Sequence, residues 1–278
     1  MMKLRLALAQ MRCQKGDWHG NLERAASYVA DAASMGCDVI VFPEMALSGY
    51  CDPARYPDAP QSLDSPLVAR FVELTKMYGI AASGGFIETN PAGDKPFITQ
   101  VLAQGGRITG VYRKVNVAED EVEWFSPGAE TPVFTLYKPG GSVKCALAVC
   151  ADTDRPDLFA AFARQGARVV FHSSAPGLYT RRTDETSWQA GHEWYKSYLF
   201  DRLPTYARAN NLYVAVATQT GATVDEDFPG GSFVFGPDGT CLAGTNNFEE
   251  TLLVHDLSLE LPGGQKSKPS EPAQASDE

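Results

Sequence analysis

Three strand-like segments constrain the fold of this chain most strongly, because each ends at a residue that can take part in catalysis. They are 39–42 before Pro43 and Glu44, 108–113 before Lys114, and 145–149 before Cys150. The first and third are apolar throughout, which is typical of strands that are buried on both faces. In open α/β folds, ligands bind at the edge formed by the carboxyl ends of such strands. We therefore expect Glu44, Lys114 and Cys150 to lie at the rim of a sheet.

Along the chain, segments with the apolar pattern of strands alternate with segments that have the apolar pattern of helices. The expected strands are 4–10, 38–42, 80–87, 98–103, 107–112, 133–137, 143–150, 168–172, 213–218, 232–235, 240–243 and 252–257. Apolar residues at helical spacing predict helices over 21–35, 67–77, 157–165 and 188–209, the last interrupted near Pro204. So many strands beside so few helices favour two sheets with helices outside both. From about residue 262 the composition turns to Gly, Pro, Ser and charged residues, so 262–278 are predicted to be disordered.

Charge and composition narrow the classes of partner. The net charge of −10 argues against nucleic acid and anionic membranes, both of which require a cationic face. Lys3 and Arg5 interrupt the apolar start, unlike a signal peptide, and no apolar run is long enough to cross a bilayer. The six cysteines form no Cys-x-x-Cys pair and the four histidines show no metal-ligand spacing. A cytoplasmic protein without metal, nucleotide or flavin is expected.

Each of the three strand-end residues has a structural alternative. Glu44 could cap the turn after Pro43, Lys114 could belong to a solvated cationic pair with Arg113, and Cys150 could be a small buried apolar residue. Together they supply a nucleophile, a base and a cation. A thiol attacks an amide only if its pKa is lowered or a base lies beside it.

In its motifs the sequence resembles the nitrilase superfamily of carbon–nitrogen hydrolases. The matching segments are 42–50 (Phe-Pro-Glu-Met-Ala-Leu-Ser-Gly-Tyr), 110–115 (Gly-Val-Tyr-Arg-Lys-Val) and 148–152 (Ala-Val-Cys-Ala-Asp). The resemblance implies an α/β fold in the form of a four-layer α-β-β-α sandwich, with residues 1–261 as a single domain. It also implies pairing into homodimers or larger homo-oligomers.

The resemblance also implies roles for individual residues. Glu44 would be the base for the thiol of Cys150, and the Lys114 ammonium with the N–H of Ala151 would stabilise the oxyanion. A second glutamate shortly before the Phe-Ser-Pro-Gly turn of 125–128 would orient the lysine or the substrate. By position Glu121 matches best, with Glu123 as the alternative.

The chain departs from the family pattern just after the nucleophile. Ala151 stands where an aromatic residue is usual, and Asp154 where an arginine is common. Nitrilases favour Cys-Trp-Glu at this place, so Ala151-Asp152 favours an amidase or carbamoylase. Tyr50 and Ser174 are weaker candidates for substrate contact.

The segment 173–203 differs most among relatives, and its role is left open. Arg181 and Arg182 could hold a substrate carboxylate and Trp188 could wall the pocket, but a solvated loop and an amphipathic helix packing on the sheet are the favoured explanation for each residue.

The expected function is hydrolysis of a small linear amide or N-carbamoyl compound through a thioester on Cys150, with release of ammonia or an amine and an acid. Three alternatives remain: nitrile hydrolysis, acyl transfer by the same three residues, and a non-catalytic binding protein on the same fold.

Overall fold

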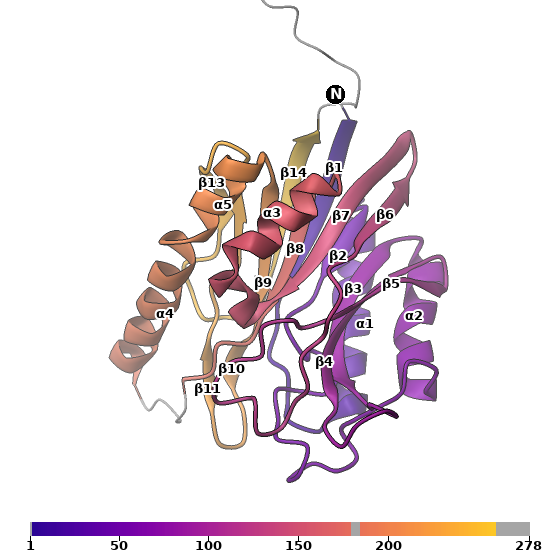
Figure 1. Ribbon diagram of the computed structural model, residues 1–278, viewed down its shortest axis with the longest axis vertical. Helices are drawn as coiled ribbons and strands as arrows, with labels where there is room; N and C mark the ends of the chain where they lie inside the picture. The colour runs from indigo at the N-terminus through magenta and orange to yellow at the C-terminus, as the bar shows by residue number, and fades with distance from the viewer. Residues whose placement is uncertain (1, 179–183, 260–278) are drawn as a thin grey trace, which may run out of the picture.

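Two six-stranded sheets form the centre of the computed structural model, which describes residues 2–178 and 184–259 (Figure 1). The first sheet has the order β14 (Thr251–Leu259), β1 (Met2–Gln10), β2 (Val39–Val41), β3 (Ala81–Glu88), β4 (Phe97–Gln104), β5 (Arg107–Arg113). The second has the order β13 (Cys241–Gly244), β12 (Phe233–Phe235), β9 (Tyr213–Thr218), β8 (Val169–Ser174), β7 (Gly141–Val149), β6 (Val133–Lys138). Both sheets are mixed, with β1, β2 and β3 parallel in one and β7, β8 and β9 parallel in the other.

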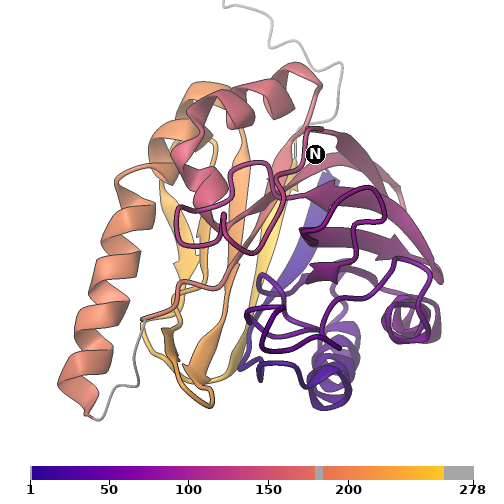
Figure 2. The ribbon, with the colours of Figure 1, turned by 60° about the horizontal axis from the view of Figure 1, so that its bottom comes forward.

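Helices cover the outer faces of the two sheets, which makes four layers (Figures 1 and 2). The outer face of the first sheet is covered by α1 (Trp18–Ser34) and α2 (Pro66–Tyr78). The side of the second sheet is covered by α3 (Pro156–Arg164), α4 (Glu185–Phe200) and α5 (Leu203–Asn210). Among the described residues, none of the helices is both long and apolar enough to cross a membrane. The predicted fold class, an α/β sandwich with helices outside two sheets, is confirmed.

The alternation of side chains along β1 explains why both of its faces are apolar. Leu4, Leu6 and Leu8 are fully buried in the same cluster as residues of the second sheet, while Ala7 and Ala9 are buried among residues of α1 and α2. Successive side chains of a strand point to opposite faces, so a strand covered on both sides must be apolar at every position. Small alanines on the helix side let the helices approach closely.

The sheet arrangement brings the carboxyl ends of strands from both sheets together. The hydroxyl of Ser173, near the end of β8, donates to the carbonyl oxygen of Phe42, just after β2, at 2.8 Å. β7 is the parallel neighbour of β8 and ends one residue before Cys150. The segments predicted to carry Glu44 and Cys150 thus meet at one rim of the sandwich.

Most elements lie where the sequence predicts them, with ends that shift by a few residues. The long helical stretch is interrupted as expected, since α4 ends at Phe200 and Pro204 lies in the first turn of α5. The short pair β10 (Thr220–Ala222) and β11 (Asp227–Pro229) was not predicted. Three residues of mixed polarity are too few for a periodic pattern. The predicted disordered tail, 262–278, lies outside the described residues.

Candidate active site

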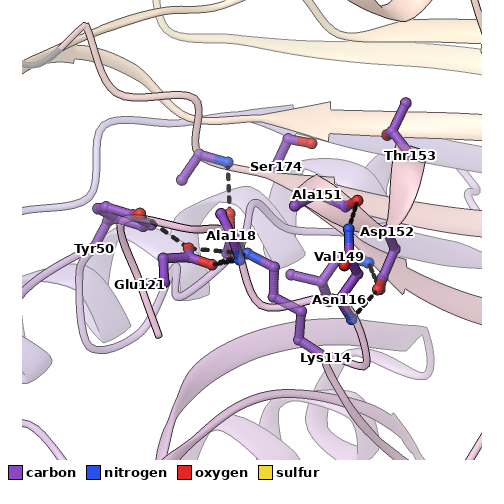
Figure 3. A network of polar contacts seen from close by, with 12 residues as sticks. Tyr50, Lys114, Asn116, Ala118, Glu121, Val149, Ala151, Asp152, Thr153 and Ser174 are labelled. Atoms are coloured by element: carbon purple, nitrogen blue, oxygen red, sulfur yellow. Dashed lines mark hydrogen bonds and ion pairs between the residues drawn. The ribbon is translucent and has the colours of Figure 1, made fainter. Parts of the chain in front are cut away.

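The ammonium of Lys114 lies between two carboxylates in the interior (Figure 3). Its Nζ is 2.8 Å from Oε1 of Glu44, and 2.9 and 2.7 Å from the two oxygens of Glu121. The three side chains are 0 to 2% exposed. A buried ammonium needs such partners because water cannot solvate it. The two glutamates raise the pKa of Lys114 against the effect of burial, so the side chain stays charged.

A strained turn presents Glu44 after β2. The next residue, Met45, has a φ of +48°, a conformation that costs a non-glycine residue roughly 1 kcal/mol or more. The second carboxylate oxygen of Glu44 accepts a hydrogen bond from the N–H of Ala175 at 3.1 Å, just beyond β8. Glu44 is therefore fixed by a side chain of the first sheet and by the backbone of the second.

Cys150 lies at the start of a short 3₁₀ helix, η1 (Cys150–Asp154), and has a φ of +42°. The carboxylate of Asp152 holds this turn by accepting from the N–H of Val149 at 2.8 Å and from the N–H of Asn116 at 2.9 Å. The Asn116 amide in turn donates to the carbonyl of Ala151 at 2.6 Å (Figure 3). Backbone strain at a nucleophile of this kind persists only where the surroundings enforce it. Asp152 and Asn116 provide that enforcement and link the turn to the Lys114 loop.

The thiol of Cys150 and the carboxylate of Glu44 influence each other's pKa. Burial raises the pKa of the Glu44 carboxylate to about 7 despite the nearby ammonium. Burial and the charge of Glu44 raise the pKa of Cys150 well above its ordinary value. These shifts favour a neutral thiol beside a base over a preformed thiolate.

Glu121, and not Glu123, is the second acidic partner of Lys114. The turn before it brings the N–H of Ala118 to 2.8 Å from its Oε2, and the hydroxyl of Tyr50 donates to its Oε1 at 2.9 Å. Glu123 is exposed. Tyr50, predicted to contact substrate, lines the adjacent cavity and also orients Glu121.

A cavity of about 390 Å³ opens beside Cys150. Its lining includes Tyr50, Glu121, Cys150, Ala151 and Ala175. Ser174 is not part of the lining; its hydroxyl lies 3.2 Å from Nδ1 of His172 instead. Among the described residues, no group of His, Cys, Asp and Glu is arranged to hold a metal ion.

Several residues that support the site were not predicted from the sequence. From the sequence, Asp152 indicates only the amidase branch, although its position two residues after the nucleophile is that of a side chain capping its own turn. The N–H of Ala175, which contacts Glu44 and the sulfur of Cys150, left no signal in the sequence, because every residue but proline has one.

Asp154, which stands where the family commonly has an arginine, forms an ion pair with a distant residue of the chain. Its carboxylate is 3.1 Å from Nε of Arg202, whose guanidinium also stacks over Tyr198 at 4.4 Å. Trp188 packs on Phe248 with ring centroids 5.1 Å apart and does not line the cavity. Arg181 and Arg182 lie outside the described residues.

Burial of His172 behind the nucleophile turn makes folding stability sensitive to acid. The ring is fully buried, with Nε2 at 2.8 Å from the hydroxyl of Thr153, and burial lowers its pKa from 6.5 to about 4. Below pH 6.5 the imidazole of His172 is protonated in the unfolded chain but stays neutral in the folded protein. The free energy of unfolding therefore decreases as pH falls toward 4. The free energy of unfolding should drop by about 2 kcal/mol between pH 7.5 and 5 through this group.

Urea unfolding of the wild type and of His172→Gln at pH 7.5 and 5 measures this contribution. The variant should lose less stability on acidification than the wild type. Equal losses in the two proteins would show that His172 is not the group responsible.

Comparisons with known proteins identify the family of this chain. Residues 5–265 match the carbon–nitrogen hydrolase family. A solved structure of an amidase from Nesterenkonia sp. AN1, in which acrylamide has added to the active-site cysteine, is 28% identical with a TM-score of 0.75. The similarity covers 92% of this chain and 93% of that one. Another structure of this amidase describes it as a member of the nitrilase superfamily.

Of two further relatives, one is about as long as this chain and the other is more than twice as long. The omega-amidase of Mus musculus is 29% identical over 276 residues, which cover 93% of this chain and 90% of that protein. A glutamine-dependent NAD(+) synthetase of Thermotoga maritima is 26% identical, and this chain spans only 43% of its length. The chain belongs to the carbon–nitrogen hydrolase family.

Proposed function

We propose that this protein hydrolyses a small linear amide or N-carbamoyl compound through a thioester on Cys150. The observation that carries the proposal is the position of Lys114, whose ammonium is held between the buried carboxylates of Glu44 and Glu121 beside a cysteine that opens on a cavity. An amide carbon is a poor electrophile, so its hydrolysis requires a nucleophile, a base and a stabilised oxyanion in one place.

In the first half of the reaction, the sulfur of Cys150 bonds to the carbonyl carbon while its proton passes to Glu44. The ammonium of Lys114 and the N–H of Ala151 stabilise the oxyanion of the tetrahedral intermediate. The C–N bond then breaks, the nitrogen takes the proton from Glu44, and ammonia or an amine leaves. A thioester on Cys150 remains.

In the second half, Glu44 removes a proton from water as its oxygen attacks the thioester carbon. The same donors stabilise the second oxyanion, and the C–S bond breaks with return of the proton to sulfur. The sum is one amide and one water converted into an acid and ammonia. Glu121 does not exchange protons in this scheme; it keeps Lys114 charged and fixed.

The test is release of ammonia across a panel of aliphatic amides, N-carbamoyl amino acids, L-glutamine and nitriles. L-glutamine belongs in the panel because of the glutamine-dependent relative. Mass spectrometry of the quenched reaction should find the acyl group on Cys150, and added hydroxylamine should capture it as a hydroxamate. A folded protein that releases no ammonia and forms no adduct with any member would exclude the proposal and favour a binding protein.

The pH dependence of the reaction should follow Glu44. Because the base works only when deprotonated, and burial raises its pKa to about 7, kcat/KM should fall about tenfold per pH unit below 7. The measurement is kcat/KM for a neutral amide from pH 5 to 9, with circular dichroism at each pH to detect unfolding. A profile that stays level down to pH 5 in folded protein would contradict the role of Glu44.

A further inference from the structure

The positive side chains that line the cavity are already paired with carboxylates. The Nζ of Lys15 lies 2.7 Å from Asp225 and 3.0 Å from Glu226, and Arg55 lies 3.2 Å from the other oxygen of Asp225. This cluster of two cations and two anions carries no net charge. Within the described part of the chain, the cavity lining thus holds no cation left over for a substrate carboxylate.

Two carboxylates of the lining, in contrast, have no cationic partner. Asp52 accepts a hydrogen bond from the N–H of Ala54 at 2.8 Å, but neither it nor Asp120 has a Lys or Arg within 4 Å in the described ranges. Asp120 is exposed and Asp52 is half-buried. The site at the base of the cavity adds further negative charge, since Lys114 faces two glutamates.

Aromatic side chains form much of the remaining wall. Tyr56, Trp124, Trp194, Tyr195 and Tyr198 line the cavity with Tyr50. The faces of such rings carry partial negative charge and attract cations, and they pack well against methylene groups. Aromatic walls with unpaired carboxylates suit a chain that is apolar along its length and positive at its end.

We infer that the cavity selects amides whose far end carries an ammonium group, as in an ω-amino amide, over neutral and anionic amides of the same length. This inference rests on the proposed function, because it names the substrate class of the same site. The reacting carbonyl would lie at Cys150 and the ammonium toward Asp52 and Asp120. A substrate carboxylate would face the same two acids without a compensating cation.

Three amides of matched length test the charge preference directly. They are 4-aminobutanamide, which is cationic, pentanamide, its neutral isostere, and succinamate, which is anionic. We expect kcat/KM to be about tenfold higher for the cationic than for the neutral amide, and lowest for the anionic one. Because the attraction is electrostatic, the preference should shrink as ionic strength rises above about 0.1 M.

Substitutions locate the preference. Asp52→Asn and Asp120→Asn keep the size of the side chain and remove its charge, so the cationic-to-neutral ratio of kcat/KM should fall about threefold in each. Glu119→Gln is the matched control, because this acid lies in the same loop, is exposed and does not line the cavity. Its ratio should equal that of the wild type. An unchanged ratio in both aspartate variants would overturn the inference, as would a preference for pentanamide.

A binding measurement separates failure of the inference from failure of the proposed function. Calorimetry with Cys150→Ala reports the affinity for the three amides without turnover. Tighter binding of 4-aminobutanamide supports the charge preference even if the wild type releases no ammonia, an outcome that would count against the proposed function alone. Tighter binding of succinamate would overturn the inference and point to Arg181 and Arg182 as partners of a substrate carboxylate.

Discussion

Cys150→Ala should lower kcat for amide hydrolysis by about 10⁴-fold or more while the protein stays folded. The methyl group cannot bond to the carbonyl carbon, so no thioester forms and only the oxyanion donors remain. The variant should keep the fold, because Cys150 is half-buried at the end of β7 and Asp152 still holds the turn. Ammonia release, the mass of the quenched protein and the thermal unfolding midpoint check the three parts of this prediction.

Two other cysteines supply matched controls. Cys145 is fully buried within β7 and does not line the cavity, and Cys51 lines the cavity at a different place from Cys150. Cys145→Ala and Cys51→Ala should both retain a thioester-forming Cys150 and measurable turnover. If activity survives in Cys150→Ala, or disappears only in Cys51→Ala, Cys150 is not the nucleophile.

Lys114→Met should impair both catalysis and folding. Turnover should fall by about 10³-fold or more, because an oxyanion donor is lost and Glu44 is no longer held. Removal of the ammonium also leaves the two buried carboxylates of Glu44 and Glu121 facing each other. Loss of one partner of a buried ion pair typically costs about 3–5 kcal/mol of stability.

The stability of this variant should recover in acid relative to the wild type. Without the lysine, burial and mutual repulsion raise the carboxyl pKa values above those of the unfolded chain, so the folded variant binds more protons and loses stability as pH rises. Urea unfolding at pH 5.5 and 8 measures the difference from wild type, which should be larger at pH 8. Lys144→Met is the control, since within the described residues the ammonium of this exposed lysine makes a single polar contact, with the backbone carbonyl of Gln165 at 3.3 Å. A similar, pH-independent loss in both variants would contradict the buried ion-pair interpretation.

The elements of the fold were largely predictable because burial dictates their patterns. A strand covered on both faces, such as β7, needs apolar side chains at successive positions, and Val143 and Cys145–Val149 have them. An amphipathic helix such as α1 repeats its buried residues at helical spacing. The hairpin β10–β11 escaped prediction because its three-residue strands are defined by backbone pairing across the turn, which leaves little trace in side-chain type.

The sequence alone singled out Glu44, Lys114 and Cys150, because each follows a strand and the chemistry requires a carboxylate, an ammonium and a thiol. It could not choose between Glu121 and Glu123, since the choice depends on a turn in which the N–H of Ala118 reaches the carboxylate.

Only the tertiary structure decided how protons and charges are distributed in the site. Desolvation and the charge of Glu44 raise the pKa of the Cys150 thiol, and Asp154 is paired with Arg202, which lies 48 residues away in the chain. Asp52 and Asp120 have no cation beside them in the described residues, although the chain has 24 lysines and arginines. Electrostatic energies depend on distance and solvent exposure in the folded state, and residue order encodes neither directly.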